Sequence, residues 1–482
     1  MLTILLLAIP FLAAGIIFLA GQKMAKQIAL LGGLATLAGT LVAIYISHQG
    51  DTTGLLTFQQ DWIGPLGISY AFSLDGISLA MMLLTSITLP LIVYASYKKV
   101  YKNAHVFYGL MMLMIGSMIG AFTTTDALLF YIFYEFALIP IYFMCMIWGH
   151  GDDRYRITMK FFIYTIFGSL FMLVALLYIH SVSGSFALTA MYEAANAMSA
   201  TEQGWLFAAF FVAFAVKIPV FPFHTWQPST YNAAPVAGTM LLGGIMLKMA
   251  TYGLIRLVLP MLPEGVSEYG SWALGLCAIS VVYASCLAIV QKKFKLLLAY
   301  SSMAHVGLLA AGILSGNAQG IQGGIVEMIS HGIVTVGLFF VYDIIESRMG
   351  HDDISKMGGI RAVNPLFAFL FFAIVMASVA LPTTSGFVGE FLLLVGLYQY
   401  SPILTVIAGL TVVLGAVYML RSFQSMMLGG ANSATSGFAA LTTHEKTVLA
   451  IIIVLIIALG IYPSPLLELS GPSVDNLLLG IH

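Results

Sequence analysis

Seven ionisable side chains lie inside long apolar stretches of this chain, where a charge is costly. They are Glu135, Lys217, Lys248, His305, Glu327, His331 and Glu390. A charged group at the centre of a bilayer costs about 2.5–3.5 kcal/mol on insertion scales, and more in simulations. Ion pathways and proton relays are the usual reason for accepting this cost. The set therefore indicates a path for protons, although opposite charges can offset one another and any single residue could be structural.

Glu135 and Lys217 are candidates for a working pair. Glu135 has no polar neighbour within one helical turn, so its partner must come from another helix, and Lys217 is the natural candidate. A nearby carboxylate favours the protonated lysine, whereas burial without that carboxylate favours the neutral lysine. Moving the two apart would switch the lysine between holding and releasing a proton. The alternative is a static ion pair that fixes two helices.

Lys248 and His331 are candidates for a relay between two such sites. Lys248 is alone on an apolar helix near mid-span, and a lone buried lysine is neutral part of the time. His331 follows Glu327 by four residues, so the two share one helix face. A histidine titrates near neutral pH and can pass a proton through water. The alternatives are a lysine that reaches to the surface and a core histidine hydrogen-bonded to Glu327.

Four further side chains lie close to a break or near the start of a span. Glu390 follows a proline-containing break, and a carboxylate there could take the proton last and release it outward. His305 is close to a basic loop, and a structural role is equally compatible with its position. His224 follows the other break and either serves proton uptake or hydrogen-bonds unwound backbone. Asp75, at the start of a span, reads as a helix cap.

The elements that must position these groups are membrane-spanning helices. Of the 482 residues, 60% are hydrophobic and 8% are charged, whereas ordinary globular domains carry about 25% charged residues. A spanning helix needs about 20 mostly apolar residues. We therefore predict an all-α integral membrane protein, a single polytopic domain over residues 1–482, with fourteen transmembrane helices. The expected spans lie near 3–20, 27–47, 72–96, 104–123, 125–147, 157–183, 204–223, 235–258, 268–289, 294–314, 320–345, 363–400 (one interrupted helix), 402–427 and 446–463.

The basic residues predict the orientation of these spans. Of the 19 Lys and Arg, all but Lys217, Lys248 and Arg256, which leaves 16, fall in or beside loops that follow odd-numbered spans. Basic loops face the cytoplasm. We expect a multi-pass protein of the bacterial cytoplasmic (inner) membrane, with both termini on the periplasmic-type side.

Two spans contain prolines in mid-run and lie five spans apart. These are the seventh, at 217–224, and the twelfth, at 381–390. A five-helix unit repeated in tandem enters the membrane in opposite directions, because five is odd. Residues 104–259 and 268–427 are therefore predicted to be inverted repeats, each with a broken helix, and such paired breaks point to an ion pathway. The alternative is that proline merely kinks two helices.

Several classes of function are excluded by composition. Cys145, Cys277 and Cys286 lie in apolar runs without CxxC spacing, which argues against a zinc site, an iron–sulfur cluster and a disulfide framework. A formal net charge of −1 gives no basic face for nucleic acid. We expect neither a metal nor a redox cofactor on this chain.

Specific motifs resemble the antiporter-like, proton-translocating subunits of respiratory complex I. The resemblance covers nearly the whole chain, and glutamate at 390 favours the chain M branch, because the sister chains L and N usually have lysine there. The motifs that carry it lie at 73–79, 130–140 (Phe-Tyr-Ile-Phe-Tyr-Glu-Phe-Ala-Leu-Ile-Pro), 160–165, 217–226 (Lys-Ile-Pro-Val-Phe-Pro-Phe-His-Thr-Trp), 247–253, 295–307 and 384–391 (Thr-Ser-Gly-Phe-Val-Gly-Glu-Phe).

The resemblance implies roles and surroundings for the buried groups. It implies that Glu135 and Lys217 form a controlling pair, that Lys248 and His331 form the central relay, and that Glu390 is the exit-side carboxylate. It also implies an NADH:quinone oxidoreductase in which FMN, iron–sulfur clusters and quinone belong to other subunits. The expected partners are other membrane-arm subunits, including homologous antiporter-like chains, and the lipid bilayer, with no nucleic acid.

The chain departs from the family in one motif, and His305 matches a family histidine. The family usually reads Leu-Pro-Asp-Ala-His before Ala-Pro, whereas Gln227-Pro-Ser-Thr-Tyr-Asn stands before Ala233-Ala-Pro here. The loss of that acidic and that histidine side chain leaves the route of proton uptake to be identified.

Two rival functions remain open at this point. One is a subunit of a multisubunit cation/proton antiporter, driven by a gradient instead of by redox chemistry. The other is a purely structural membrane scaffold. Co-purification with flavin- and iron-bearing chains favours complex I, and sodium-dependent proton flux without electron donors favours the antiporter. Coupled transport that survives replacement of Glu135, Lys248 and Glu390 favours the scaffold.

Overall fold

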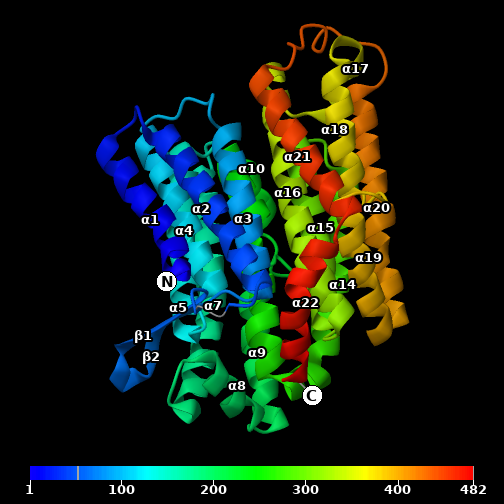
Figure 1. Cartoon of the computed structure of the whole chain (residues 1–482). Coiled ribbons are helices and arrows are strands. Elements are labelled where there is room, and N and C mark those ends of the chain that lie inside the picture. Colours follow the sequence, from blue (N-terminus) through cyan, green and yellow to red (C-terminus); the bar gives the residue numbers. More distant parts are fainter. Residues whose placement is uncertain (52–53, 481–482) are drawn as a thin grey trace.

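The chain folds into a bundle of helices that run roughly side by side (Figure 1). In this computed structural model, residues 1–51 and 54–480 are described. Within a membrane each backbone N–H and C=O must bond inside its own segment, so apolar runs of this length become helices. Twelve helices of the described residues are long and apolar enough to cross a membrane. The chain is therefore a mostly helical, multi-pass membrane protein.

The first half of the chain forms helices α1 to α10. Helices α5 and α6 together make one span, with an irregularity at Ala137 between them. The bounds are α1 (Leu2–Ala20), α2 (Ala25–His48), α3 (Gly76–Ala95), α4 (Ala104–Thr123), α5 (Ala127–Phe136), α6 (Leu138–Trp148), α7 (Arg154–Ser183), α8 (Leu188–Asn196), α9 (Ala200–Lys217) and α10 (Gln227–Ala233).

The second half contains the most deeply buried helix, α16, whose most apolar stretch is wholly covered by the rest of the chain. This helix forms the centre of the bundle. The bounds are α11 (Val236–Leu241), η2 (Leu242–Met246), α12 (Leu247–Gly253), η3 (Leu254–Val258), α13 (Leu259–Met261), α14 (Pro263–Val290), α15 (Phe294–Leu314), α16 (Ala318–Met349), η4 (Ile354–Lys356), α17 (Ile360–Val363), α18 (Pro365–Ser378), α19 (Ser385–Tyr400), α20 (Pro402–Met427), α21 (Thr443–Ile461) and α22 (Ser464–Leu479).

The expectation of an all-α chain is wrong in one segment. Strands β1 (Thr57–Ile63) and β2 (Ile68–Ser73) pair antiparallel, with Gln59 opposite Ala71, and the short turn η1 (Gly64–Leu66) connects them. Aromatic and β-branched residues favour strands, and Gly67 adopts a positive φ of 63° that closes the turn. The segment is too short to span a membrane, and the pairing of the two strands provides hydrogen-bond partners for its backbone.

Both proline-containing segments interrupt helices. Helix α9 ends at Lys217, ahead of Pro219, and the next helix begins only at Gln227. Helix α18 ends at Ser378, and α19 begins at Ser385, after Pro382. Proline lacks the N–H that a helix interior needs. The expected seventh span is therefore shorter than 204–223, and the expected twelfth span is divided in two.

Two turns of π-helix, η2 and η3, interrupt the span from Val236 to Met261. Sequence patterns did not predict them. A π turn contains one residue more than an α turn, and such turns are frequent at functional sites. Lys248 lies on α12, between the two.

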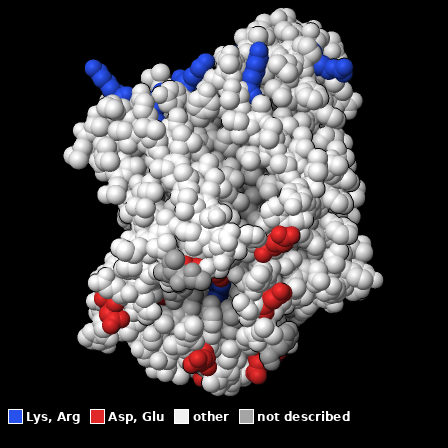
Figure 2. Space-filling model, viewed as in Figure 1, with Lys and Arg blue, Asp and Glu red and all other residues white. Residues whose placement is uncertain are grey.

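Charge is distributed unevenly over the surface. Lys and Arg side chains gather along the upper edge of the molecule, whereas Asp and Glu side chains gather on its lower part (Figure 2). Helix α1 begins, and helix α22 ends, away from the basic edge (Figure 1). The two ends of the bundle thus differ in the way that the two faces of a membrane require.

Candidate functional site

Lys217 is the last residue of α9 and is almost completely buried. Its Nζ donates a hydrogen bond to the backbone oxygen of Tyr134 at 3.0 Å, and it lies 3.3 Å from the centre of the Tyr134 ring. The C-terminal end of a helix carries partial negative charge, which also favours a cation. The ammonium group of Lys217 is therefore held by neutral groups: a carbonyl, an aromatic face and the end of its own helix.

Glu135 follows Tyr134 directly on α5 and is half-buried. No ion pair joins Glu135 to Lys217 among the described residues. Adjacent residues of a helix point about 100° apart, so the same helix cannot present both Tyr134 and Glu135 squarely to the lysine. Tyr134 was missed by the sequence reasoning, and its only signal was the aromatic character of residues 130–136.

Lys248 is fully buried and bridges two helices. Its Nζ donates to the backbone oxygen of Gly243, within η2, at 2.5 Å. It also lies 2.7 Å from Nδ1 of His331 on α16. Two nitrogens at this distance form a hydrogen bond only when one donates a proton and the other offers a lone pair. The two residues therefore hold a transferable proton between them, whichever of them carries it.

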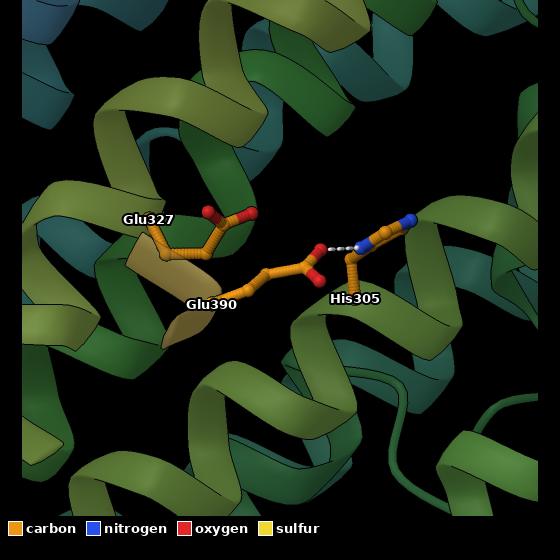
Figure 3. A group of neighbouring side chains, drawn as sticks. All are labelled: His305, Glu327 and Glu390. Carbon is orange, nitrogen blue, oxygen red and sulfur yellow. Dashed lines mark hydrogen bonds and ion pairs between the residues drawn. The ribbon is translucent and has the colours of Figure 1, made fainter. Parts of the chain in front are cut away.

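His305 and Glu390 form a second hydrogen-bonded pair. Nδ1 of His305, on α15, lies 2.8 Å from Oε1 of Glu390, on α19, and both side chains are buried (Figure 3). Glu390 is in the second turn of α19, just after the break. Nε2 of His305 and Oε2 of Glu390 have no hydrogen-bond partner among the described residues.

Glu327 lies beside this pair (Figure 3). One potential metal-ligand atom of each residue, a ring nitrogen of His305 and a carboxylate oxygen of Glu327 and of Glu390, lies within 4.8 Å of the other two. Close approach of α16 and α19 makes this possible, because a Cβ at Gly389 would lie only 2.6 Å from Oε2 of Glu327. Oε2 of Glu327 has no partner among the described residues. The three ligand atoms are close enough to hold a metal ion. Alternatively, one proton shared by the two carboxyl groups would reduce the repulsion between them.

A small cavity joins the two hydrogen-bonded pairs. Its volume open to the centre of a water molecule is about 20 Å³, which is room for about one water. The rings of His305 and His331 are 6.0 Å apart, centre to centre, across this region. Its polar lining consists of Ser301, Ser302, His305, Glu327, Ser330, His331, Thr335, Ser378 and Glu390.

His224 lies apart from this cavity. It is buried, and its ring packs against those of Phe221 and Tyr283. Burial, followed by the charge of Lys160, lowers the pKa of His224 from its ordinary value. The neutral imidazole is thus favoured, and Nδ1 has no partner among the described residues.

Asp75 caps helix α3, as predicted. Its carboxylate accepts from the backbone N–H of Ser78 and forms an ion pair with Arg256. Burial raises the pKa of Asp75, but the charge and hydrogen bond of Arg256 outweigh it, so the net pKa lies below its ordinary value. This ion pair ties α3 to η3 on the acidic side of the molecule.

The structure thus gathers five of the predicted groups and separates the others. His331, His305, Glu327 and Glu390 line one cavity, and Lys248 contacts His331 beside it. Lys217 and Glu135 lie at another point of the bundle, at the end of α9. Two hydrogen-bonded, proton-holding pairs separated by a water-sized space are chemically able to exchange protons.

The chain matches a known protein family and several relatives in sequence. The model of the family described as "NADH:quinone oxidoreductase/Mrp antiporter, TM" matches residues 124–415. NADH-quinone oxidoreductase subunit M of Rickettsia prowazekii is 37% identical over 459 residues, covering 95% of this chain and 93% of that one.

Solved structures share the fold over the whole chain. A chain of respiratory complex I from Thermus thermophilus with bound NADH superposes with a TM-score of 0.92 at 30% identity, covering 100% of both chains. A chain of the Mrp complex from Dietzia sp. superposes with a TM-score of 0.85 at 22% identity, covering 100% of this chain and 98% of that chain, which is a likeness of fold alone. The chain therefore belongs to the NADH:quinone oxidoreductase/Mrp antiporter transmembrane family, alongside relatives that are subunit M of NADH-quinone oxidoreductase.

Proposed function

We propose that this chain is the proton-translocating M-type subunit in the membrane arm of an NADH–quinone oxidoreductase. Electron transfer in other subunits drives protons through its buried Glu, Lys and His side chains. The observation that carries the proposal is the pair of hydrogen-bonded groups, Lys248–His331 and His305–Glu390, on either side of one water-sized cavity.

The order of transfer follows from the two sites. Lys217, at the end of α9, responds to the charge of Glu135 and is the controlling group of the first half. A proton leaving that half is taken up by the Lys248–His331 pair. Through the cavity it reaches His305 and Glu390, from which it is released toward the outer side. Glu327 shares the last site, and His224 serves the inner mouth of the first break.

The membrane topology has fourteen spans, in two inverted five-helix repeats over 104–259 and 268–427. The count adds α9 and the α18–α19 pair, which are too short or too polar to qualify alone, to the twelve helices above. Both termini face the periplasmic side. The one-sided basic edge in Figure 2, opposite to the ends of the chain in Figure 1, supports this orientation.

Redox chemistry belongs to the rest of the complex. FMN, iron–sulfur clusters and quinone are held by other subunits, and homologous antiporter-like chains are the neighbours of this one in the membrane arm. The three cysteines fit this assignment, because Cys145, Cys277 and Cys286 lie in apolar runs without the CxxC spacing of an iron–sulfur site.

The second candidate is a subunit of a multisubunit cation/proton antiporter. The fold shared with the Mrp chain from Dietzia sp. favours it, as does the family description, which covers both classes. Identity is lower for that chain, 22% against 37% for subunit M of Rickettsia prowazekii. Proton flux that depends on sodium and needs no electron donor would favour this second candidate.

The test of the first proposal is Lys217→Ala in the purified complex, reconstituted into vesicles. We expect assembly to survive, because the carbonyl and the ring that contact the lysine directly are neutral. NADH-driven proton translocation should be abolished. Unchanged translocation in an assembled complex would reject the assigned role.

A further inference from the structure

Three buried polar atoms on α10 and α15 form no hydrogen bond of ordinary geometry among the described residues. They are Oε1 of Gln227, Oη of Tyr231 and Oγ of Ser302. Gln227 and Tyr231 are fully buried, and Ser302 nearly so. A buried polar atom left unsatisfied costs about 1–3 kcal/mol. Three of them in one place mark a site where water or exchanging hydrogen bonds are expected.

These three residues face one another. Gln227 and Tyr231 are four residues apart on α10, so they lie on one helix face. Nε2 of Gln227 donates to the backbone oxygen of Ala299 on α15 at 3.2 Å, which orients the amide, and Ser302 is one turn further along α15. The side chains of Gln227 and Ser302 are polar neighbours of the Tyr231 hydroxyl, although neither forms a hydrogen bond of ordinary geometry with it.

The tyrosine hydroxyl also lies against the backbone that holds Lys248. A Cβ at Gly243 would lie 3.1 Å from Oη of Tyr231. The carbonyl of the same Gly243 accepts the hydrogen bond from Nζ of Lys248. On the other side, Ser302 lines the cavity that contains His331. The Tyr231 hydroxyl therefore lies between α10 and the Lys248–His331 pair.

We propose that Gln227, Tyr231 and Ser302 form the inner segment of the proton path, in which the Tyr231 hydroxyl hands protons to the Lys248–His331 pair. This inference rests on the proposed function and supplies its route of uptake. A proton arrives on a lone pair of the hydroxyl oxygen as the hydroxyl's own proton leaves for the next acceptor, and rotation about the C–O bond restores the starting state. Nothing is oxidised or reduced. A phenol, with an ordinary pKa near 10, is both donor and acceptor at neutral pH.

Packing alone does not account for the hydroxyl. The Tyr231 ring lies edge-on to Phe339, with ring centres 5.8 Å apart and planes at 70°. Phenylalanine would make the same contact, and it would not bury an unpartnered oxygen. In the family pattern an acidic and a histidine side chain stand in this stretch. Here, uncharged hydroxyl and amide groups occupy it.

The experiment compares isosteric variants of the purified complex in proteoliposomes, with NADH-driven proton translocation measured per assembled complex. Tyr231→Phe removes only the hydroxyl and should slow translocation at least about tenfold, the low end of what one proton-transfer group contributes. Tyr231→His restores a proton-exchanging ring and should recover most of the rate. Tyr108→Phe is the matched control, because Tyr108 is equally buried but hydrogen-bonds to Ser96, away from the cavity.

Each outcome bears on the inference. A wild-type rate in Tyr231→Phe overturns it, as does a rate in Tyr231→His that is as low as in the Phe variant. If Tyr231→Phe fails to assemble, Ser302→Ala and Gln227→Leu replace it, and wild-type rates in both overturn the inference. Lys248→Met in the same assay separates the two proposals. A wild-type rate in Lys248→Met contradicts the proposed function itself, whereas a slow Lys248→Met beside a normal Tyr231→Phe contradicts only the uptake route.

Discussion

The two breaks in the bundle expose opposite ends of helices, and each carries the charge that suits its end. Lys217 is the last residue of α9, where the helix dipole favours a cation. Glu390 is in the second turn of α19, where the positive end of the dipole favours an anion, although more weakly than in the first turn. The charge at each break thus suits the dipole of the helix that carries it.

The two sites also differ in what surrounds the charge. Lys217 is held by the carbonyl and the ring of Tyr134, which are neutral. Glu390 has both an imidazole and a second carboxyl group, that of Glu327, close by. The first site therefore holds or loses one charge, whereas the second can share a proton among three groups. In the function that we propose, the first site controls transfer and the second stores a proton before release.

The largest effect is expected from crowding the second site. Gly389→Ala places a Cβ 2.6 Å from Oε2 and 2.8 Å from Cα of Glu327, so α19 must move away from α16. Overpacking of this kind costs about 1–3 kcal/mol. The thermal midpoint of the complex should fall and proton translocation should be lost. Gly409→Ala, whose Cβ would meet only Leu394 at 3.8 Å, is the control. Equal losses of translocation in both variants would mean that translocation does not depend on the close approach of Glu327 and Glu390.

An intermediate effect is expected at the first site. Tyr134→Leu keeps the backbone carbonyl but removes the aromatic face under Lys217. A cation–π contact is worth about 0.5–2 kcal/mol, so translocation should slow by roughly twofold to thirtyfold. Tyr134→Phe keeps the face and should stay near the wild-type rate. If the Phe variant is as slow as the Leu variant, the hydroxyl and not the ring supports the lysine.

The smallest effect is expected outside both sites, at Asp75. Because the pKa of Asp75 lies below its ordinary 3.8, the stability that its ion pair with Arg256 contributes is present above about pH 4. It is lost as the pH falls through the lowered pKa. Asp75→Asn keeps an oxygen for the cap but removes the ion pair. Its thermal midpoint should start slightly lower and change less on acidification, while translocation per assembled complex stays unchanged. A loss of translocation without loss of assembly would place Asp75 on the proton path.

The sequence predicted the breaks because proline interrupts a helix locally. It predicted the buried groups because a charged residue within an apolar run can be identified from the sequence alone. It did not predict the contact between the Lys217 ammonium group and Tyr134. That contact depends on the rotation of α5 against α9, which the sequence of a single helix does not encode. The hairpin at 57–73 was missed because short strands between long spans read as loops.

The closeness of Glu327 to Glu390 was also beyond the sequence. It depends on Gly389, and a glycine indicates close packing of two helices only when the partner helix is known. The role of Gln227 and Tyr231 was hidden for a similar reason. Their departure from the family pattern was visible, but the atoms that their side chains approach belong to α15 and η2, far along the chain.

Because of the π turn at 242–246, the direction in which the Lys248 side chain points depends on the number of residues before it as well as on their chemistry. Each residue in a helix turns the next by roughly 100°, so the one additional residue of η2 sets which way the lysine faces. A deletion of a single residue here, even one that leaves every charged side chain in place, would swing the ammonium group away from His331 and cut the central relay. Natural or engineered length changes in this stretch should therefore be as damaging as loss of the lysine, and substitutions that keep the length should be milder where, unlike at Gly243, they add no close contact.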